Sequence, residues 1–378
     1  MKLLPSLLLL CFALHLNAQG IHFSDNREVP LQLNPAFAGA IHNKYVHRLV
    51  LAHRRQGNAV LGRDEFETTY LSYDLKLGLC DRVEGMYIGL GLELLHDQVG
   101  RTLGEEAQFF HRQEANANAA LGISLGKGSY LMAGVRGGLL SHGLREDRLT
   151  FDNQFDGRDF DASRSSLENF ATERIMHFDL GAGVILRGTI PSRGVDRFVR
   201  VETYELGLSL MHLNNKRDRF LANSVVGDLV REYRVHAKFD LLFEDRFRMR
   251  PALLFYKFGG FFNNGKQWQL RPLLEFPALN RLMFAGGTRI SNFAERGSHL
   301  DALVFTLKWK PYRAIGGGRT EKDHLIVGVS VDVNISPQLV PATGGFGAFE
   351  LFVTKYFNGD RTKPVCCPSS NTENQVFY

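Results

Sequence analysis

The chain has 378 residues, of which 44% are hydrophobic and 22% charged, with a formal net charge of +5 at pH 7. This balance excludes a disordered chain, and no internal run of about 18 apolar residues is present that could cross a bilayer as a helix. The basic residues are scattered rather than grouped, so we predict no nucleic-acid partner. A content of 29 Phe, 11 Tyr and 38 Gly is typical of strands and turns.

The first eighteen residues, MKLLPSLLLLCFALHLNA, differ from the rest of the chain. One cation, Lys2, is followed by an apolar run and then by a small residue, which is the pattern of a secretory signal peptide. We therefore predict that residues 1–18 are a signal peptide cleaved after Ala18. The alternative is a buried first strand or helix.

Alternation with a period of two dominates the remaining chain, and it places successive side chains on opposite faces of a strand. In YIGLGLELL, residues 87–95, apolar positions from Ile88 to Leu94 alternate with Tyr, Gly, Gly and Glu. The same alternation recurs at residues 178–186, 205–211, 303–309 and 327–333. It predicts an all-β chain.

A soluble β-sandwich also alternates, with its apolar face turned inward. Here the opposing face is small and polar, and the apolar sets end in Phe, Tyr or Trp, as the lipid-facing band of a transmembrane barrel does. Closure into a barrel also leaves no unpaired strand edge in lipid. We therefore predict a transmembrane antiparallel β-barrel of about 14 strands over residues 41–357, in the cell outer membrane. The expected strand centres are residues 48, 71, 90, 117, 134, 181, 207, 237, 252, 270, 286, 304, 328 and 352.

The lengths of the connections favour a barrel whose amino terminus is in the periplasm, because odd-numbered connections then face outward and are longer. The two longest, at about 142–175 and 213–229, are odd-numbered, although the even ones around 190–197 and 311–323 are longer than this rule predicts. We expect residues 142–175 to be a long extracellular or plug loop, residues 19–40 a periplasmic or lumenal segment, and residues 358–378 a periplasmic tail.

The stretch LTFDNQFDGRDFDAS, residues 149–163, combines carboxylates with three phenylalanines inside this long loop. Aromatic side chains often anchor protein contacts, so the loop is a candidate docking surface or a plug. The alternative is a solvated loop without a partner, since loops are generally polar.

Two patterns suggest catalysis or metal binding, but each has a simpler explanation. Residues 122–126 match G-x-S-x-G, the pattern of a nucleophile elbow, and Ser124 with Lys127 matches S-x-x-K. A nucleophile elbow needs a strand followed by a helix. Here the G-x-S-x-G residues complete a strand that is followed by a turn. The carboxylates of Asp152, Asp156, Asp159 and Asp161 could bind Ca²⁺, but they lack the spacing of an EF-hand loop. We predict surface carboxylates, no enzyme activity, no metal and no cofactor.

Three cysteines remain after the signal peptide, Cys80, Cys366 and Cys367. Their odd number predicts no disulfide framework, and no pair has the spacing of metal ligands. We assign them no role.

Three motifs, in order along the chain, resemble those of the PorP/SprF family of type IX secretion outer-membrane proteins. The first is Asn34-Pro35-Ala36 with Gly39, and the second is NQFDG at residues 153–157. The third is a closing pair of strands that carry Asp332 and Glu350, followed by a tail with Cys367-Pro368. The sequence departs from the family in GAFELF, where members often carry Ser or His beside the Glu, and in the doubled cysteine.

The resemblance implies a barrel of the type IX secretion and gliding machinery of Bacteroidetes-like bacteria. It implies partners of two kinds: secreted proteins with a type IX C-terminal domain, such as large adhesins, and periplasmic ring components. Outer-membrane lipid is a further expected partner of a barrel in that membrane. We expect the barrel to assist export or surface anchoring of those secreted proteins. The partner-binding candidates are Phe151, Asp152, Asn153, Gln154, Phe155, Asp156, Gly157, Asn34, Pro35 and Gly39.

Two other functions stay open on the sequence. The first is a channel or transporter for a small polar or lipid molecule, with Asp179, Glu205 and Lys238 lining a water-filled lumen. The second is an outer-membrane hydrolase, which would need a catalytic Ser124.

Overall fold

A computed structural model describes most of the chain between residues 23 and 357. The described ranges are 23–41, 45–56, 65–78, 85–101, 110–126, 128–145, 149, 151–161, 163–190, 198–214, 220–221, 229–244, 246–259, 267–279, 281–292, 299–311, 323–335 and 346–357. The predicted signal peptide, the predicted tail and all three remaining cysteines lie outside these residues.

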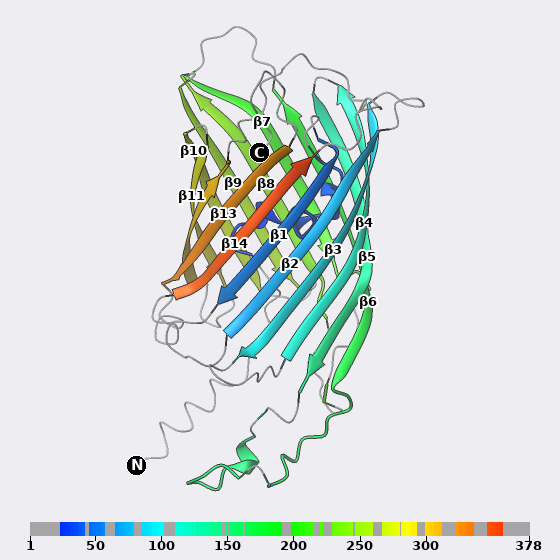
Figure 1. The fold of residues 1–378 in the computed structure, drawn as a ribbon, viewed down its shortest axis with the longest axis vertical. Coiled ribbons are helices and arrows are strands. Elements are labelled where there is room, and N and C mark those ends of the chain that lie inside the picture. Colours follow the sequence, from blue (N-terminus) through cyan, green and yellow to red (C-terminus); the bar gives the residue numbers. More distant parts are fainter. Residues whose placement is uncertain are drawn as a thin grey trace.

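Fourteen antiparallel strands form one closed barrel, in which each strand pairs with the next and β1 pairs with β14 (Figure 1). Every expected strand centre falls within the corresponding strand, so the predicted barrel of about 14 strands is confirmed. The strands are β1 (His47–Gln56), β2 (Glu65–Gly78), β3 (Met86–Arg101), β4 (Phe110–Gly126), β5 (Ser129–Leu144), β6 (Arg174–Thr189), β7 (Val199–Met211), β8 (Glu232–Phe243), β9 (Phe247–Phe258), β10 (Trp268–Leu279), β11 (Leu282–Ser291), β12 (His299–Trp309), β13 (Asp323–Asn334) and β14 (Phe346–Phe357).

Apolar side chains face outward and polar side chains face the lumen, which is the reverse of a soluble sandwich. On β3, Leu92 is 62% exposed while its neighbour Glu93 is 2% exposed. The same division holds around the wall, where the exposed large side chains are mostly Leu, Val and Phe and most of the buried ones on the strands are charged or amide groups. Lipid can solvate such an outer face, so the arrangement excludes the sandwich.

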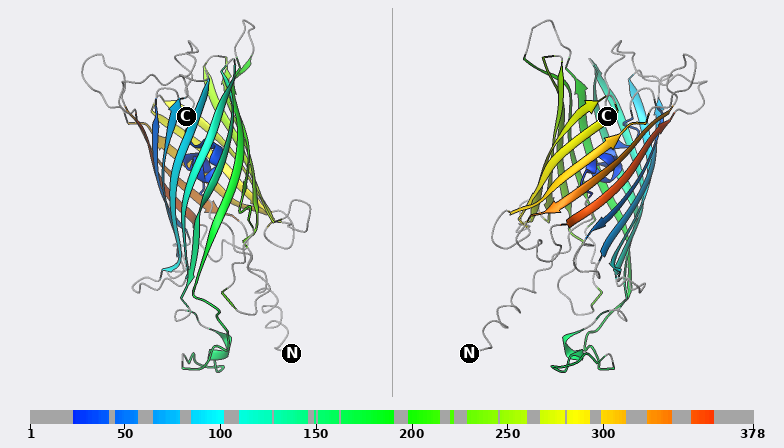
Figure 2. Two further views of the ribbon diagram at one scale, coloured as in Figure 1. Left: turned by 90° about the vertical axis from the view of Figure 1, so that its right-hand side faces the viewer. Right: turned by 60° about the vertical axis from the view of Figure 1, so that its left-hand side comes forward.

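The two ends of the barrel differ in their connections. At one end, β4 turns into β5 within residues 126–129; at the other, the β5–β6 and β7–β8 connections cover residues 145–173 and 212–231. We call these the inner and outer ends, because short turns are typical of the periplasmic side and long loops of the extracellular side. The β5–β6 connection extends well beyond the outer end (Figures 1 and 2). No helix among the described residues is long and apolar enough to cross a membrane.

Residues 23–41, here called the lumen segment, lie inside the barrel (Figure 2). They form three short helices, η1 (Asn26–Glu28), α2 (Pro30–Leu33) and η2 (Pro35–Phe37). Leu31, Asn34 and Ala36 are completely buried. The barrel is therefore filled at mid-height by the chain's own amino-terminal residues.

Candidate functional site: the filled lumen and the outer loop

The lumen segment owes its shape to local capping. The Asp25 carboxylate accepts a hydrogen bond from Arg27 N at 3.2 Å at the start of η1, and Asn34 Oδ1 accepts one from Ala36 N at 2.9 Å at the start of η2. Pro30 and Pro35 occupy the first helical positions, where a missing N–H costs nothing. Gly39 then takes a φ of 65°, in the left-handed region that suits glycine.

Glycines in the barrel wall make room for this segment. A Cβ atom added to Gly89 would overlap Ala38 O, and one added to Gly134 would lie 2.5 Å from Ala36 N. A Cβ atom added to Gly183 would overlap the Asn34 side chain. The small inward face on β3, β5 and β6 is therefore a packing surface for the lumen segment, where the sequence suggested only a polar lumen.

The predicted site residues Asn34, Pro35 and Gly39 all lie on this packing surface. Asn34 Nδ2 donates to Val184 O at 3.2 Å and to Leu208 O at 3.1 Å, which ties the segment to β6 and β7. Gly39 N donates to Asp74 Oδ2 at 2.9 Å. Pro35 is buried at the start of η2. These residues are thus enclosed by the barrel wall.

Arg48 holds the carboxyl end of the lumen segment in place. Arg48 Nε donates to Asp74 Oδ1 at 2.8 Å and Arg48 Nη2 to Asp74 Oδ2 at 2.9 Å, the two-pronged geometry that guanidinium prefers. Arg48 Nη2 also donates to Phe37 O at 3.0 Å. Phe37 in turn stacks on His236, with ring centroids 5.3 Å apart.

The amino end of the segment is held by β1, β13 and β14. Ser24 N donates to Glu350, and Ser24 Oγ accepts from Arg54 Nη1 at 2.6 Å. Arg54 also pairs with Glu350 and, at 3.2 Å, with Asp332. Of the two carboxylates that carry the family resemblance in the closing strands, Glu350 contacts the lumen segment directly and Asp332 contacts Arg54, which binds Ser24.

A second charged cluster surrounds η1. Lys308 Nζ lies 2.8 Å from Glu275 Oε2 and 3.1 Å from Asp25 Oδ2. Arg27 Nη2 lies 3.3 Å from Glu275, and Arg250 lies 3.2 Å from the same carboxylate. Burying so many charges costs free energy, and this cost is offset only because each charge has a partner of opposite sign.

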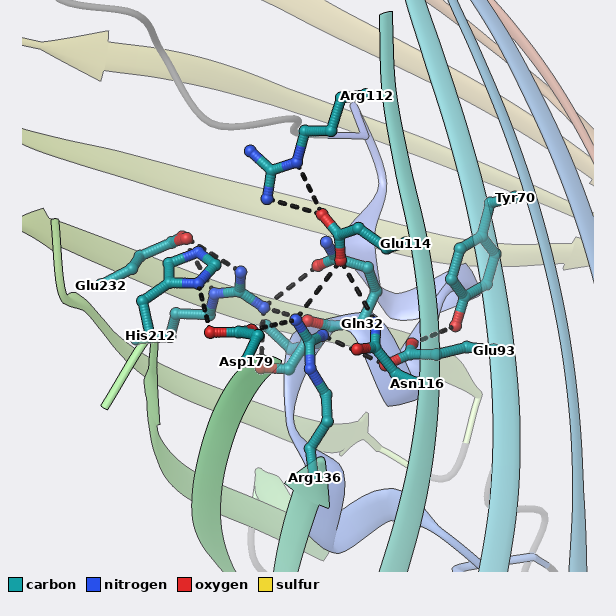
Figure 3. A network of polar contacts seen from close by, with 12 residues as sticks. Gln32, Tyr70, Glu93, Arg112, Glu114, Asn116, Arg136, Asp179, His212 and Glu232 are labelled. Carbon is teal, nitrogen blue, oxygen red and sulfur yellow. Dashed lines mark hydrogen bonds and ion pairs between the residues drawn. The ribbon is translucent and has the colours of Figure 1, made fainter. Parts of the chain in front are cut away.

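A third cluster centres on Arg136 of β5 (Figure 3). Its guanidinium lies 3.1 Å from Glu93, 3.4 Å from Glu114 and 3.3 Å from Asp179. These carboxylates are contributed by β3, β4 and β6 and are almost completely buried. Further contacts come from Tyr70 to Glu93, from Arg112 and Asn116 to Glu114, and from His212 to Asp179.

Sequence reasoning missed Ser24, Arg54 and Arg136. The available signal is a charged residue at an inward position of each consecutive strand, but its use requires the register between strands. Asp179, Glu205 and Lys238, the residues expected to line an open lumen, do face inward. Asp179 belongs to the Arg136 cluster, whereas Glu205 and Lys238 border a cavity of about 120 Å³ that remains beside the lumen segment.

The other predicted site residues, Phe151 to Gly157, lie in the outer loop, defined as residues 149–173. Asp152–Gln154 form the short helix η4. Gln154 is buried: its side chain accepts from Phe151 N at 3.1 Å and donates to Arg164 O at 3.0 Å. Asn153 Nδ2 donates to Ser166 O at 3.2 Å.

The tip of the outer loop is a tight hairpin. Asp156 Oδ1 accepts from Arg158 N and Asp159 N, both at 2.8 Å, and Gly157 has a φ of 98°. The two backbone donors lower the pKa of Asp156, because they stabilise its ionised form. Ser163 likewise lowers the pKa of Asp161 through its hydroxyl and its backbone N–H.

This hairpin presents apolar side chains to solvent. Phe155 and Phe160 pair across it and are 54% and 47% exposed. Leu167 is 77% exposed. Phe151, by contrast, packs edge-to-face on Phe170 at 6.1 Å, nearer the base of the loop. Within NQFDG, the polar residues and the glycine shape the loop and Phe155 is left available for contact.

The catalytic and metal-binding patterns do not assemble. Residues 122–126 are the end of β4, and β5 begins at Ser129, so Ser124 does not sit on a strand-to-helix turn. Among the described residues, no three His, Cys, Asp or Glu side chains gather as metal ligands.

A closed barrel with an apolar outer face and a filled, charged lumen defines the chain as a membrane protein of the outer-membrane β-barrel class. Comparison with protein families places it further: the chain belongs to the family described as "Type IX secretion system membrane protein PorP/SprF", whose model matches residues 16–354. The resemblance to this family that the three sequence motifs indicated is therefore confirmed. The family is one of secretion-system membrane proteins, and its membership implies association with that machinery.

Among solved structures, three outer-membrane barrels have a distant similarity to the chain. The chain is similar to the CymD monoaromatic hydrocarbon channel, at 10% identity over 90% of this chain and 95% of that one, with a TM-score of 0.45. It is similar to the toluene transporter TbuX of Ralstonia pickettii, at 10% identity over 88% and 94%, with a TM-score of 0.44. The translocator domain of the autotransporter NalP from Neisseria meningitidis gives 12% identity over 89% and 96%, with a TM-score of 0.34. At scores this low the similarities carry no argument about function. A search of curated proteins found no match.

Proposed function

We propose that this barrel is a docking component of the type IX secretion system, which binds the C-terminal domain of a secreted protein at its outer end. In this role it assists export or surface anchoring of large proteins such as adhesins. The lumen segment and its ion pairs make the barrel a stable support, and the outer loop carries the contact surface.

The exposed Phe155–Phe160 pair is the observation that carries the proposal. Two aromatic rings in water are unfavourable unless a partner covers them, and buried aromatics dominate the binding energy of many interfaces. Hydrogen bonds within the loop hold both rings at its tip, so little conformational entropy is lost when a partner binds. The nearby carboxylates Asp152 and Asp156 are exposed and give the surface a polar, acidic rim.

The double substitution Phe155→Ser/Phe160→Ser tests the proposal. If each ring is an interface anchor worth about 2 kcal/mol, surface display of the partner should fall by more than tenfold. The matched control is Arg158→Ser/Asp159→Ser, in the same turn, whose side chains make no described contact to the loop. Heat-modifiable gel migration verifies that both variants fold. Display unchanged by the phenylalanine substitutions contradicts the assignment of this loop.

A pull-down with the same variants identifies the partner. The tagged full-length protein is isolated in mild detergent from its own outer membrane, and the co-purifying proteins are identified. We expect a large secreted protein to be recovered with the wild type and lost with the double phenylalanine variant. Periplasmic ring components, which we place at the inner end, should be recovered with both.

A channel for a small polar molecule is the second candidate, and the cavity beside Glu205 and Lys238 is the observation in its favour. At about 120 Å³ this cavity is well below the roughly 300 Å³ at which ligand pockets begin. Transport would therefore require the lumen segment to move. Steady conductance of the wild-type protein in planar bilayers would favour the channel, and a sealed barrel would favour docking.

A further inference from the structure

A groove of about 440 Å³ lies on the outer surface of the barrel, in the outer halves of β2 to β6. Figure 1 shows these strands side by side. The groove is open to the membrane side of the wall, and it is separate from the lumen and from the tip of the outer loop. The side chains that line it include Leu94, Ala115, Leu139, Met176, His96 and Arg174.

Strand register arranges the wall here in rows that change from apolar to polar toward the outer end. Leu71, Leu94, Ala115, Leu139 and Phe178 are successive partners across five strands. Two residues further out, the row is Thr69, His96, Gln113, Ser141 and Met176, and the next is Glu67, Gln98, His111, Gly143 and Arg174. Because Ala115 is small between two leucines, the apolar row dips at β4 and forms the floor of the groove.

Basic groups gather at the polar end. Arg174 Nε donates to Ser141 Oγ at 3.2 Å, and no described carboxylate forms an ion pair with its guanidinium. The His111 ring lies over Gly143, the register partner of Arg174. Glu114, a carboxylate that lines the groove, is already paired with Arg112 and Arg136. On the outer wall, Glu67 contacts Gln98 at 2.8 Å and His53 at 3.5 Å.

We infer that this groove binds a phosphorylated lipid of the outer leaflet, with one acyl chain against Leu94, Ala115 and Leu139 and its phosphate at Arg174. The apolar floor faces the acyl region of the bilayer, and the guanidinium and imidazoles stand where head groups begin. Arginine prefers phosphate oxygens because it offers parallel N–H donors, and basic pockets on membrane proteins bind anionic head groups. Any barrel contacts bulk lipid; the inference is one specific, retained molecule.

The test uses the purified, delipidated full-length protein in neutral detergent, with diphosphoryl lipid A as the probe and native mass spectrometry to count bound molecules. We expect one retained lipid on the wild type. Arg174→Gln should weaken binding by about tenfold or more, the usual effect of losing a charge-assisted contact. Ala115→Leu should weaken it by filling the floor.

Matched controls are Lys355→Gln, an outward cation near the inner end of β14, and Ala119→Leu, an outward alanine on the same strand outside the groove. Both should bind as the wild type does. Equal affinity in all five proteins overturns the inference, as does inorganic phosphate competing as strongly as the whole lipid, since it would reveal a simple anion site. If Arg174→Gln fails to fold, the Ala115 and Ala119 pair still decides.

Discussion

The lumen segment and the outer loop both contain a short motif rich in Asn, Gly and an aromatic residue, yet their hydrogen bonds lead in opposite directions. Asn34 and Gly39 bond to β6, β7 and β2, far away in the sequence. Gln154 and Asp156 bond to residues within the same loop. The lumen motif therefore belongs to the stability of the barrel, whereas the loop motif sets the shape of an exposed surface.

Loss of the central cation in the lumen should have the largest effect. Arg136→Met leaves Glu93, Glu114 and Asp179 buried together without it, and breaking a buried ion pair this way costs about 3–5 kcal/mol. We expect the temperature at which the folded band disappears in heat-modifiable gels to drop strongly. Arg158→Met, in the outer loop, is the control and should leave it unchanged. Equal temperatures would show that the Arg136 cluster does not stabilise the barrel.

A side chain at Gly134 should displace the lumen segment. The Cβ of Gly134→Val would press on the backbone of Ala36, which cannot yield as a flexible side chain can. We expect steady conductance in planar bilayers from this variant and none from the wild type. Gly137→Val is the matched control, because its Cβ faces outward and meets only side-chain atoms at ordinary contact distances, Phe178 Cζ at 3.4 Å and Leu180 Cδ2 at 3.7 Å. A sealed Gly134→Val barrel would mean that the segment tolerates a shift.

Strain at the loop tip should have a smaller and local effect. Gly157→Val forces a β-branched residue to a φ of 98°, at a cost of roughly 1–3 kcal/mol. Trypsin should then cleave faster at Arg158 and Arg164, with no change in the unfolding of the barrel. Asp159→Asn, which keeps the turn hydrogen bonds, should be cleaved at the wild-type rate. Cleavage that stays slow in the glycine variant would indicate that the hairpin is not held by this turn.

The smallest effect concerns pH. Because the folded loop lowers the pKa of Asp156, its bonds to Arg158 N and Asp159 N are fully present above the ordinary carboxyl pKa. They are lost as the pH falls through the lowered value. Hydrogen exchange at these two amides should therefore differ between wild type and Asp156→Asn at neutral pH and converge in acid. A difference that persists in acid would contradict the role given to the carboxylate.

Sequence reasoning recovered the barrel because alternation is a local property. Val327 to Val333 alternate with small and polar residues, so the strand can be found without knowledge of its neighbours. The same reasoning could not choose between periplasm and lumen for residues 19–40. The lumen segment has no period, and its partners, such as Leu208 and Glu350, are distant residues that only the closed barrel brings near.

Within the candidate site, residue types were easier to predict than roles. Phe155 was singled out as aromatic in a polar loop and is in fact exposed. Gly89 and Gly183 were interpreted as part of a small lumenal face, but they lie directly against the lumen segment. Arg136 went unnoticed because its significance depends on Glu93 and Asp179, which come from two other strands.

The position of Ser24 has a consequence for how the barrel is assembled. Its two partners, Arg54 and Glu350, belong to β1 and β14, the first and last strands to be synthesised, which meet at the seam that closes the cylinder. The binding site for Ser24 is complete only once β1 and β14 have paired along that seam. Seating of the amino end of the lumen segment and closure of the seam are therefore coupled steps, and a barrel that closes around an empty interior lacks one of the contacts that hold its two edges in register.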